Sequence, residues 1–144
     1  MIKEFDPSKF IGVVLDESGI LKHFTGQTKR RLIEMFHNTE FRLCCTATPA
    51  PNDHLELGNH AEFLGVMDSN KMISRWFIND TMQAGSYRLK RHAEKDFWRW
   101  MTSWAVCISK PSDLHKIFSD NGFILPELNI VPHIVKVDHS RAQE

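Results

Sequence analysis

The chain has 144 residues, of which 42% are hydrophobic and 25% are charged, proportions that are ordinary for a globular domain. Its eighteen basic and eighteen acidic residues cancel, which excludes a strong overall field that would attract the chain to nucleic acid. The three cysteines are odd in number and two of them are adjacent, so they do not make a disulfide framework and fit a reducing compartment. The sequence shows neither a secretory signal nor an apolar run of membrane-spanning length, so we expect a soluble cytoplasmic protein without a membrane partner.

The first half of the chain has the pattern of a strand, a helix and a strand. Residues 11–15 and 41–46 are short apolar runs that end in polar residues, which is typical of parallel strands buried on both faces. Between them, residues 26–37 carry apolar side chains at helical spacing among basic ones, which predicts an amphipathic helix. Short loops suffice to join these elements, as in a βαβ unit.

The second half is predicted to be mainly helical. Pro49 and Pro51 end the second strand. Asn52 or Asp53 can then cap a helix that runs to about Leu64 and is ended by Gly65. The pattern then predicts a short helix near residues 70–78. A polar loop over residues 79–90 follows, then the longest helix, over about 92–106, and a last strand over 134–137.

Two polar motifs follow the two predicted strands. Asp16-Glu17-Ser18 comes after the first strand, and Thr46-Ala47-Thr48-Pro49 comes after the second. Ligands of open parallel sheets bind beyond the carboxyl ends of the strands, so both motifs are expected at one edge of the sheet. An isolated Asp-Glu pair is more often an ordinary turn. The two motifs together favour a functional site.

These motifs resemble those of superfamily 2 helicases. The likeness is to the C-terminal part of the first motor lobe in chromatin-remodeller-like ATPases of phage or prophage type. It is carried by residues 15–22, 42–58 and 61–65 and continues through the Trp-rich segment 77–107. The resemblance implies an α/β fold, a partial RecA-like lobe with a short parallel sheet flanked by helices and a helical Trp-rich extension.

The resemblance also implies roles for the motif residues. Asp16 would hold Mg²⁺, and Glu17 would polarise the water that attacks ATP, so both are candidate catalytic residues. Thr46, Ala47 and Thr48 would form the motif that couples the nucleotide state to nucleic-acid binding. The alternative for the threonines is that their hydroxyls bond only to the local backbone.

The 144 residues contain no G-x-x-x-x-G-K-[ST] sequence, the loop that binds the phosphates of ATP in this class. We therefore expect a single incomplete motor lobe, with a βαβ core over 1–66, a helical extension over 67–110 and a tail over 111–144. ATP and Mg²⁺ serve the intact family, and the chain alone is expected to hydrolyse ATP at background. Its expected partners are DNA, weakly, and a separately encoded P-loop fragment or second lobe. The alternatives are a non-catalytic DNA- or protein-binding module, or a degenerate prophage remnant.

Basic and aromatic residues alternate in the Trp-rich segment. Phe97, Trp100, Met101 and Trp104 recur at helical spacing, which predicts a buried stripe, whereas Trp98 lies off it. Salt-sensitive contacts with DNA are expected from the remaining members of the segment: Arg88, Lys90, Arg91, Trp98 and Arg99.

The histidines between residues 54 and 60 do not follow a zinc-binding motif. His54, Glu56 and His60 lack the H-E-x-x-H order. We therefore expect His60 to be a satisfied or solvated side chain and not a zinc ligand.

Overall fold

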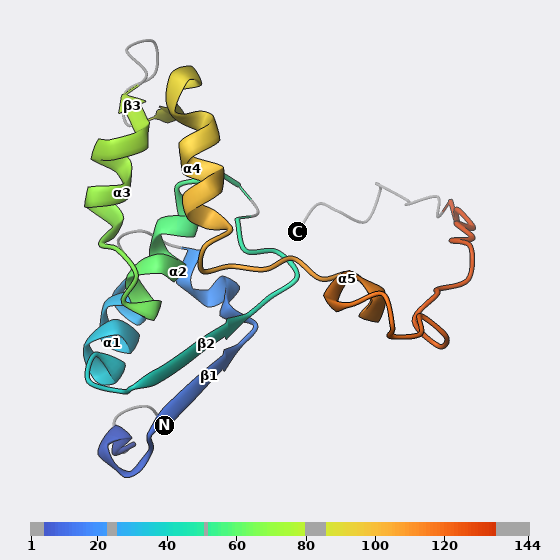
Figure 1. Cartoon of the computed structure of the whole chain (residues 1–144), viewed down its shortest axis with the longest axis horizontal. Helices are drawn as coiled ribbons and strands as arrows, with labels where there is room; N and C mark the ends of the chain where they lie inside the picture. Colours follow the sequence, from blue (N-terminus) through green and yellow to red (C-terminus); the bar gives the residue numbers. More distant parts are fainter. Residues whose placement is uncertain (1–4, 23–25, 51, 80–85, 135–144) are drawn as a thin grey trace, which may run out of the picture. The chain divides into compact units, whose positions relative to one another are not determined.

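The computed structural model describes residues 5–22, 26–50, 52–79 and 86–134 (Figure 1). The chain divides into two compact units, Met1–Ala105 and Val106–Glu144. The first unit contains a parallel two-stranded sheet and the longer helices, so the fold is mixed α/β. No helix among the described residues is both long enough and apolar enough to span a bilayer.

The predicted βαβ unit is present. Strand β1 (Gly12–Asp16) pairs in parallel with β2 (Phe41–Cys45), and helix α1 (Gln27–Phe36) connects them. The register places Asp16 opposite Cys45 at the carboxyl ends of the two strands. The structure confirms the order and the parallel direction predicted from the sequence.

Helices cover one face of this sheet. Helix α2 (Glu56–Leu64), α1 and the 3₁₀ helix η3 (Ser18–Lys22) contribute a buried cluster against which the inward strand residues pack. The cluster consists of Leu21, Leu32, Phe36 and Phe63, and the strand residues against it are Val13, Leu15 and Cys44. Helix α2 begins later than predicted, because residues 53–55 form a turn in which the Asp53 carboxylate accepts the N–H of Leu55.

The opposite face of the sheet is exposed. Val14 is 64% exposed, Phe41 60% and Leu43 53%. The prediction that both strands are buried on both faces is therefore wrong. Its physical reason is that the helices packed on these two strands in the described residues lie on one side only (Figure 1).

The rest of the first unit joins two helices through a small hairpin. Helix α3 (Ser69–Trp76) leads into β3 (Phe77–Asn79), which pairs antiparallel with β4 (Tyr87–Leu89). The predicted loop over 79–90 is thus partly strand, and residues 80–85 lie outside the described residues. A 3₁₀ turn, η4 (Arg91–Ala93), then precedes helix α4 (Glu94–Met101).

Helix α4 is shorter than predicted. It has eight residues, whereas α1 has ten, so the expectation that the longest helix spans 92–106 is wrong. The hydroxyls of Thr102 and Ser103 donate to the carbonyls of Arg99 and Trp100. Side-chain bonds of this kind compete with the helical ladder and help to end it.

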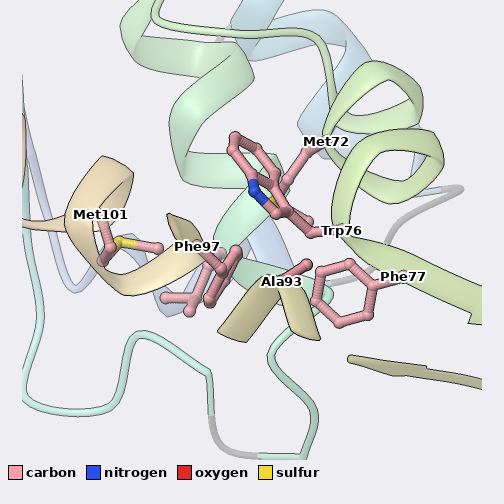
Figure 2. Packing of buried hydrophobic residues seen from close by; sticks show 7 residues of the cluster. Met72, Trp76, Phe77, Ala93, Phe97 and Met101 are labelled. Carbon is pink, nitrogen blue, oxygen red and sulfur yellow. The ribbon is translucent and has the colours of Figure 1, made fainter. Parts of the chain in front are cut away.

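The aromatic stripe of α4 forms a second core with α3, as predicted. Phe97 and Met101 are buried against Met72, Trp76 and Phe77, as Figure 2 shows. Trp100 and Trp104 pack at the border of this cluster. Trp98 lies off the stripe and is 39% exposed.

The second unit has little regular structure. It contains helix α5 (Pro111–Leu114). The Asp120 carboxylate accepts hydrogen bonds from the N–H and the hydroxyl of Ser112, and it forms an ion pair with Nζ of Lys110, 3.0 Å away. Ile134 belongs to no strand, and the other residues of the strand predicted over 134–137 lie outside the described residues.

The end of α2 gives a test of the fold. Gly65 has φ 74°, and its N–H donates to the carbonyls of Ala61 and Glu62, as in a left-handed helix cap. A Cβ at this position would lie 2.3 Å from Nη2 of Arg42, which would have to move. We expect Gly65→Ala to lower the free energy of unfolding by about 1–2 kcal/mol, the cost of a side chain in the left-handed region.

The matched variant is Gly65→Asn, because asparagine tolerates the left-handed region better than alanine. Urea unfolding should rank the stabilities Gly65, then Asn, then Ala. An alanine variant as stable as the wild type would contradict the left-handed conformation of residue 65.

Candidate active site

The chain turns sharply after the first strand. Glu17 has φ 50°, the left-handed region that residues with a side chain rarely adopt. Its N–H donates to Oδ1 of Asp16 at 3.0 Å. This turn leads directly into η3, and both carboxylates are exposed at the end of β1.

The second motif lies at the same edge of the sheet. Thr46 directly follows Cys45, the residue opposite Asp16, and neighbouring strands lie about 4.8 Å apart. A Cβ built on Gly19 would lie 3.8 Å from Oγ1 of Thr46 and 3.9 Å from the Thr48 carbonyl oxygen. The structure therefore brings the two motifs together, as the sequence predicts.

The threonine hydroxyl nevertheless bonds locally. Oγ1 of Thr46 accepts the N–H of Thr48 at 3.1 Å. In the described part of the chain no direct hydrogen bond joins Thr46 or Thr48 to Asp16 or Glu17. The alternative, in which the threonine hydroxyl bonds only to the local backbone, is therefore the one that the structure shows for Thr46. Ala47 and Thr48 are exposed beside this turn.

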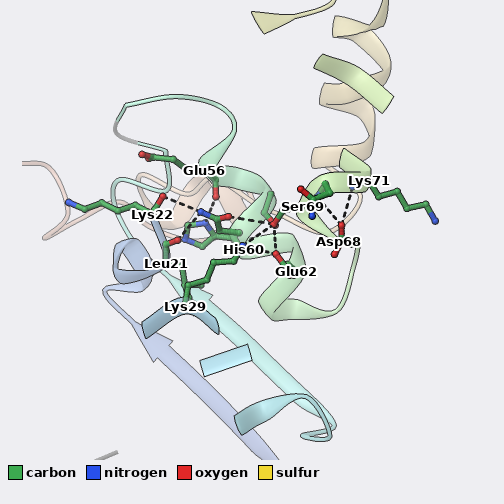
Figure 3. Close-up of polar contacts among 12 residues, drawn as sticks. Leu21, Lys22, Lys29, Glu56, His60, Glu62, Asp68, Ser69 and Lys71 are labelled. Atoms are coloured by element: carbon green, nitrogen blue, oxygen red, sulfur yellow. Dashed lines mark hydrogen bonds and ion pairs between the residues drawn. The ribbon is translucent and has the colours of Figure 1, made fainter. Parts of the chain in front are cut away.

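Two adjacent residues of α2 hold the segment that follows Glu17. Nδ2 of Asn59 donates to the carbonyls of Leu21 at 2.8 Å and Lys22 at 3.1 Å (Figure 3). Nε2 of His60 lies 3.2 Å from Oγ of Ser18. Sequence analysis missed the contacts of Asn59. It treated His60 only as a satisfied or solvated residue, and the structure shows it satisfied.

The hydrogen bonds of His60 define its tautomer. Nδ1 lies 3.3 Å from the carbonyl oxygen of Glu56, which can only accept, so Nδ1 carries the proton. In the neutral ring Nε2 then accepts the hydroxyl proton of Ser18. Burial lowers the pKa of His60, against the opposing effect of the Glu56 carbonyl.

Ser18 also contacts the second strand. Burial raises the pKa of the Cys44 thiol to about 11, while the neighbouring Ser18 hydroxyl acts in the opposite direction. Cys44 is therefore a neutral thiol near pH 7. The buried Ser18 hydroxyl thus bonds to α2 and lies near a buried thiol of β2.

A buried ion pair ties the helices together beneath this segment. Nζ of Lys29 on α1 lies 2.7 Å from a carboxylate oxygen of Glu62 on α2. The Ser69 hydroxyl on α3 accepts from Lys29 and lies within hydrogen-bond distance of the Glu62 carboxylate and of the Gly58 carbonyl, to one of which it donates its single proton (Figure 3). These contacts link three helices through charged and polar groups that burial would otherwise penalise.

Among the described residues, Asp16 and Glu17 are exposed and line neither of two hollows found there. A hollow of 510 Å³ is lined by another set of residues, Lys22, Leu55, Glu56, Asn59, Asn70, Ile73, Ser74 and Tyr87. Within the described ranges no three His, Cys, Asp or Glu side chains gather as metal ligands. Any metal held by Asp16 would therefore need further ligands from water or from the substrate.

The residues predicted to contact DNA differ in their surroundings. Arg88, Arg91 and Arg99 are exposed. Nζ of Lys90, in contrast, donates to the carbonyls of Ser74 and Arg75, both at 3.0 Å. Lys90 therefore caps the C-terminus of α3, where a positive charge is favourable.

The ring of Trp98, the aromatic residue predicted to contact DNA, is partly exposed. It packs edge-on against His54 with ring centroids 5.4 Å apart. Its exposed part remains accessible, as the sequence predicts for a residue off the buried stripe.

Comparison with protein families, curated proteins and solved structures finds no match to this chain.

The buried His60 predicts a pH dependence of stability. Its folded-state pKa lies below the ordinary value of 6.5, so the unfolded chain takes up the proton first as the pH falls. The stabilisation that neutral His60 contributes should therefore be fully present above about pH 6.5. The free energy of unfolding should decline as the pH falls from there toward the folded-state pKa. The nearby Glu56 carboxylate partly offsets this loss by favouring the protonated ring.

The matched variant is His60→Gln, which keeps an acceptor within reach of Ser18 but does not titrate. Urea unfolding between pH 5 and pH 7 should give a shallower pH dependence for the variant. Equal slopes for the two proteins would show that His60 does not cause the decline.

Proposed function

We propose that this chain is part of a DNA-dependent ATPase motor of superfamily 2, of the remodeller-like type. The observation that carries the proposal is the parallel βαβ unit, which has Asp16-Glu17 and Thr46-Ala47-Thr48 at the same edge of adjacent strands. Crevices beyond the carboxyl ends of parallel strands are the usual ligand sites of such sheets. The motor would act in the cytoplasm.

The residues at this edge suit a magnesium nucleotide. Asp16 offers carboxylate oxygen, which Mg²⁺ prefers, and one or two carboxylates often suffice when water and phosphates complete the shell. The ion, when bound, would neutralise charge on the transferred phosphoryl group. Glu17 is exposed one residue further on, where its carboxylate can orient and deprotonate water as a general base.

The exposed sheet face supports a role within a larger lobe. Parallel sheets are usually covered on both faces, whereas Val14, Phe41 and Leu43 are open here. Without a P-loop sequence in its 144 residues, the chain by itself supplies the acid pair but not the usual phosphate-binding loop. ATP hydrolysis by the chain alone should therefore stay at background.

The proposed metal role of Asp16 is testable with Mn²⁺, a paramagnetic substitute for Mg²⁺. Mn²⁺ should broaden the amide NMR signals of residues 16–19 and 46–48 more than those of other segments. Asp16→Asn should abolish this local broadening, because an amide binds the ion far more weakly than a carboxylate.

The matched control is Asp53→Asn, which alters an exposed carboxylate in another turn. It should leave the broadening at residues 16–19 unchanged. Equal broadening around every exposed carboxylate, or broadening that persists in Asp16→Asn, would contradict the proposed site.

DNA binding should be weak and independent of sequence. The net charge is zero, but Arg88, Arg91 and Arg99 are exposed cations on the segment of the chain that also carries the partly exposed Trp98. Each phosphate contact should contribute about −0.9 to the slope of log affinity against log salt on duplex DNA. Arg91→Gln and Arg99→Gln should each reduce the slope by about that amount.

Lys90→Gln is the internal comparison, because its ammonium already binds the end of α3. It should lower stability and change the salt slope less than the arginine variants. Fluorescence anisotropy at several salt concentrations measures both the affinity and the slope. An affinity for DNA that does not change with salt would contradict the proposed phosphate contacts.

A further inference from the structure

We propose that Asn59 and His60 are positioning residues for the acid pair, which hold segment 17–22 and thereby the backbone of Glu17. The inference rests on the proposed function for the meaning of that pair. The contacts by which α2 fixes the turn after β1 do not depend on that function.

The contacts are placed at both ends of one short segment. His60 bonds to Ser18 at the start of η3, at 3.2 Å. Asn59 bonds to Leu21 and Lys22 at its end, at 2.8 Å and 3.1 Å. Two adjacent residues of α2 therefore hold η3 at its first residue and at its last two residues.

Burial makes these contacts hard to replace. Ser18 and Asn59 are fully buried, and His60 is only 4% exposed. Water cannot readily take over a hydrogen bond at such a site, so removal of one partner leaves the other unsatisfied. The grip is therefore stronger than the same bonds would be on the surface.

Glu17 stands between two fixed points. On one side Asp16 pairs with β2, and on the other side Ser18 is held by His60. A left-handed residue with a side chain persists only when its surroundings impose that conformation. Release of Ser18 would let Glu17 relax to negative φ and move its carboxylate relative to Asp16.

The experiment compares variants of the full chain by NMR. His60→Ala and Ser18→Ala each remove one partner of the hydrogen bond between His60 and Ser18. If one of these variants does not fold, the other still tests the proposal. His60→Gln restores an acceptor. Phe63→Leu is the matched control, because it weakens the packing of the same helix but leaves both polar contacts intact.

Two readouts report on the segment itself. The amide of Ile20 donates to the Glu17 carbonyl at 3.2 Å, and its hydrogen exchange reports opening of the turn. A strong intraresidue Hα–HN NOE at Glu17 reports the left-handed backbone. We expect His60→Ala and Ser18→Ala to speed Ile20 exchange about tenfold, the effect of losing one typical buried hydrogen bond, and to weaken the NOE.

His60→Gln should return both readouts toward the wild-type values, and Phe63→Leu should leave the NOE intact at a similar loss of global stability. Unchanged exchange and NOE in His60→Ala or Ser18→Ala would overturn the proposal. An identical response to Phe63→Leu would overturn it too, since the effect would then be one of general stability.

Mn²⁺ broadening separates this inference from the proposed function. Loss of local broadening in His60→Ala, with rescue in His60→Gln, supports a positioning role toward the metal. Broadening that is unchanged in His60→Ala overturns that role. No local broadening in the wild type would contradict the proposed function, while the exchange and NOE readouts would still decide whether α2 holds Glu17.

Discussion

The parallel pairing of β1 with β2 is the constraint on which the other features depend. Because the two strands run in the same direction, their polar endings meet at one edge, with Asp16 opposite Cys45. An antiparallel arrangement would send the second motif to the far end of the sheet. The register also sets the position of η3, since it begins directly beyond the paired residues. Helix α2 can bond to η3 only because the paired strands place η3 beside it.

Polar contacts then determine how the helices sit on this unit. Apolar clusters supply most of the favourable burial, but they tolerate many arrangements of similar volume. The pair of Lys29 and Glu62, with Ser69 between the helices, accepts few alternatives, because a misplaced charge would remain buried without its partner. We infer that the network contributes more to the relative placement of α1, α2 and α3 than to net stability.

Local patterns in the sequence predicted the features that depend on neighbours along the chain. The βαβ order, the glycine that ends α2 and the buried stripe of α4 each follow from spacing over a few residues. The roles of Asn59 and His60 do not, since their partners lie about forty positions away and no periodicity marks them. Strands β3 and β4 are too short to show an alternation. The open face of the sheet escaped prediction because apolar residues there have the same pattern as residues that are covered.

The left-handed backbone of Glu17 has a consequence for how substitutions there would be tolerated. Glycine adopts this conformation without the steric conflict that glutamate meets. A library selected for protein abundance should therefore enrich glycine at position 17, although glycine has no carboxylate. A library of the intact motor selected for ATP-dependent work should retain glutamate at the same position. The two selections would diverge at this residue, and their disagreement would separate a residue kept for chemistry from one kept for folding.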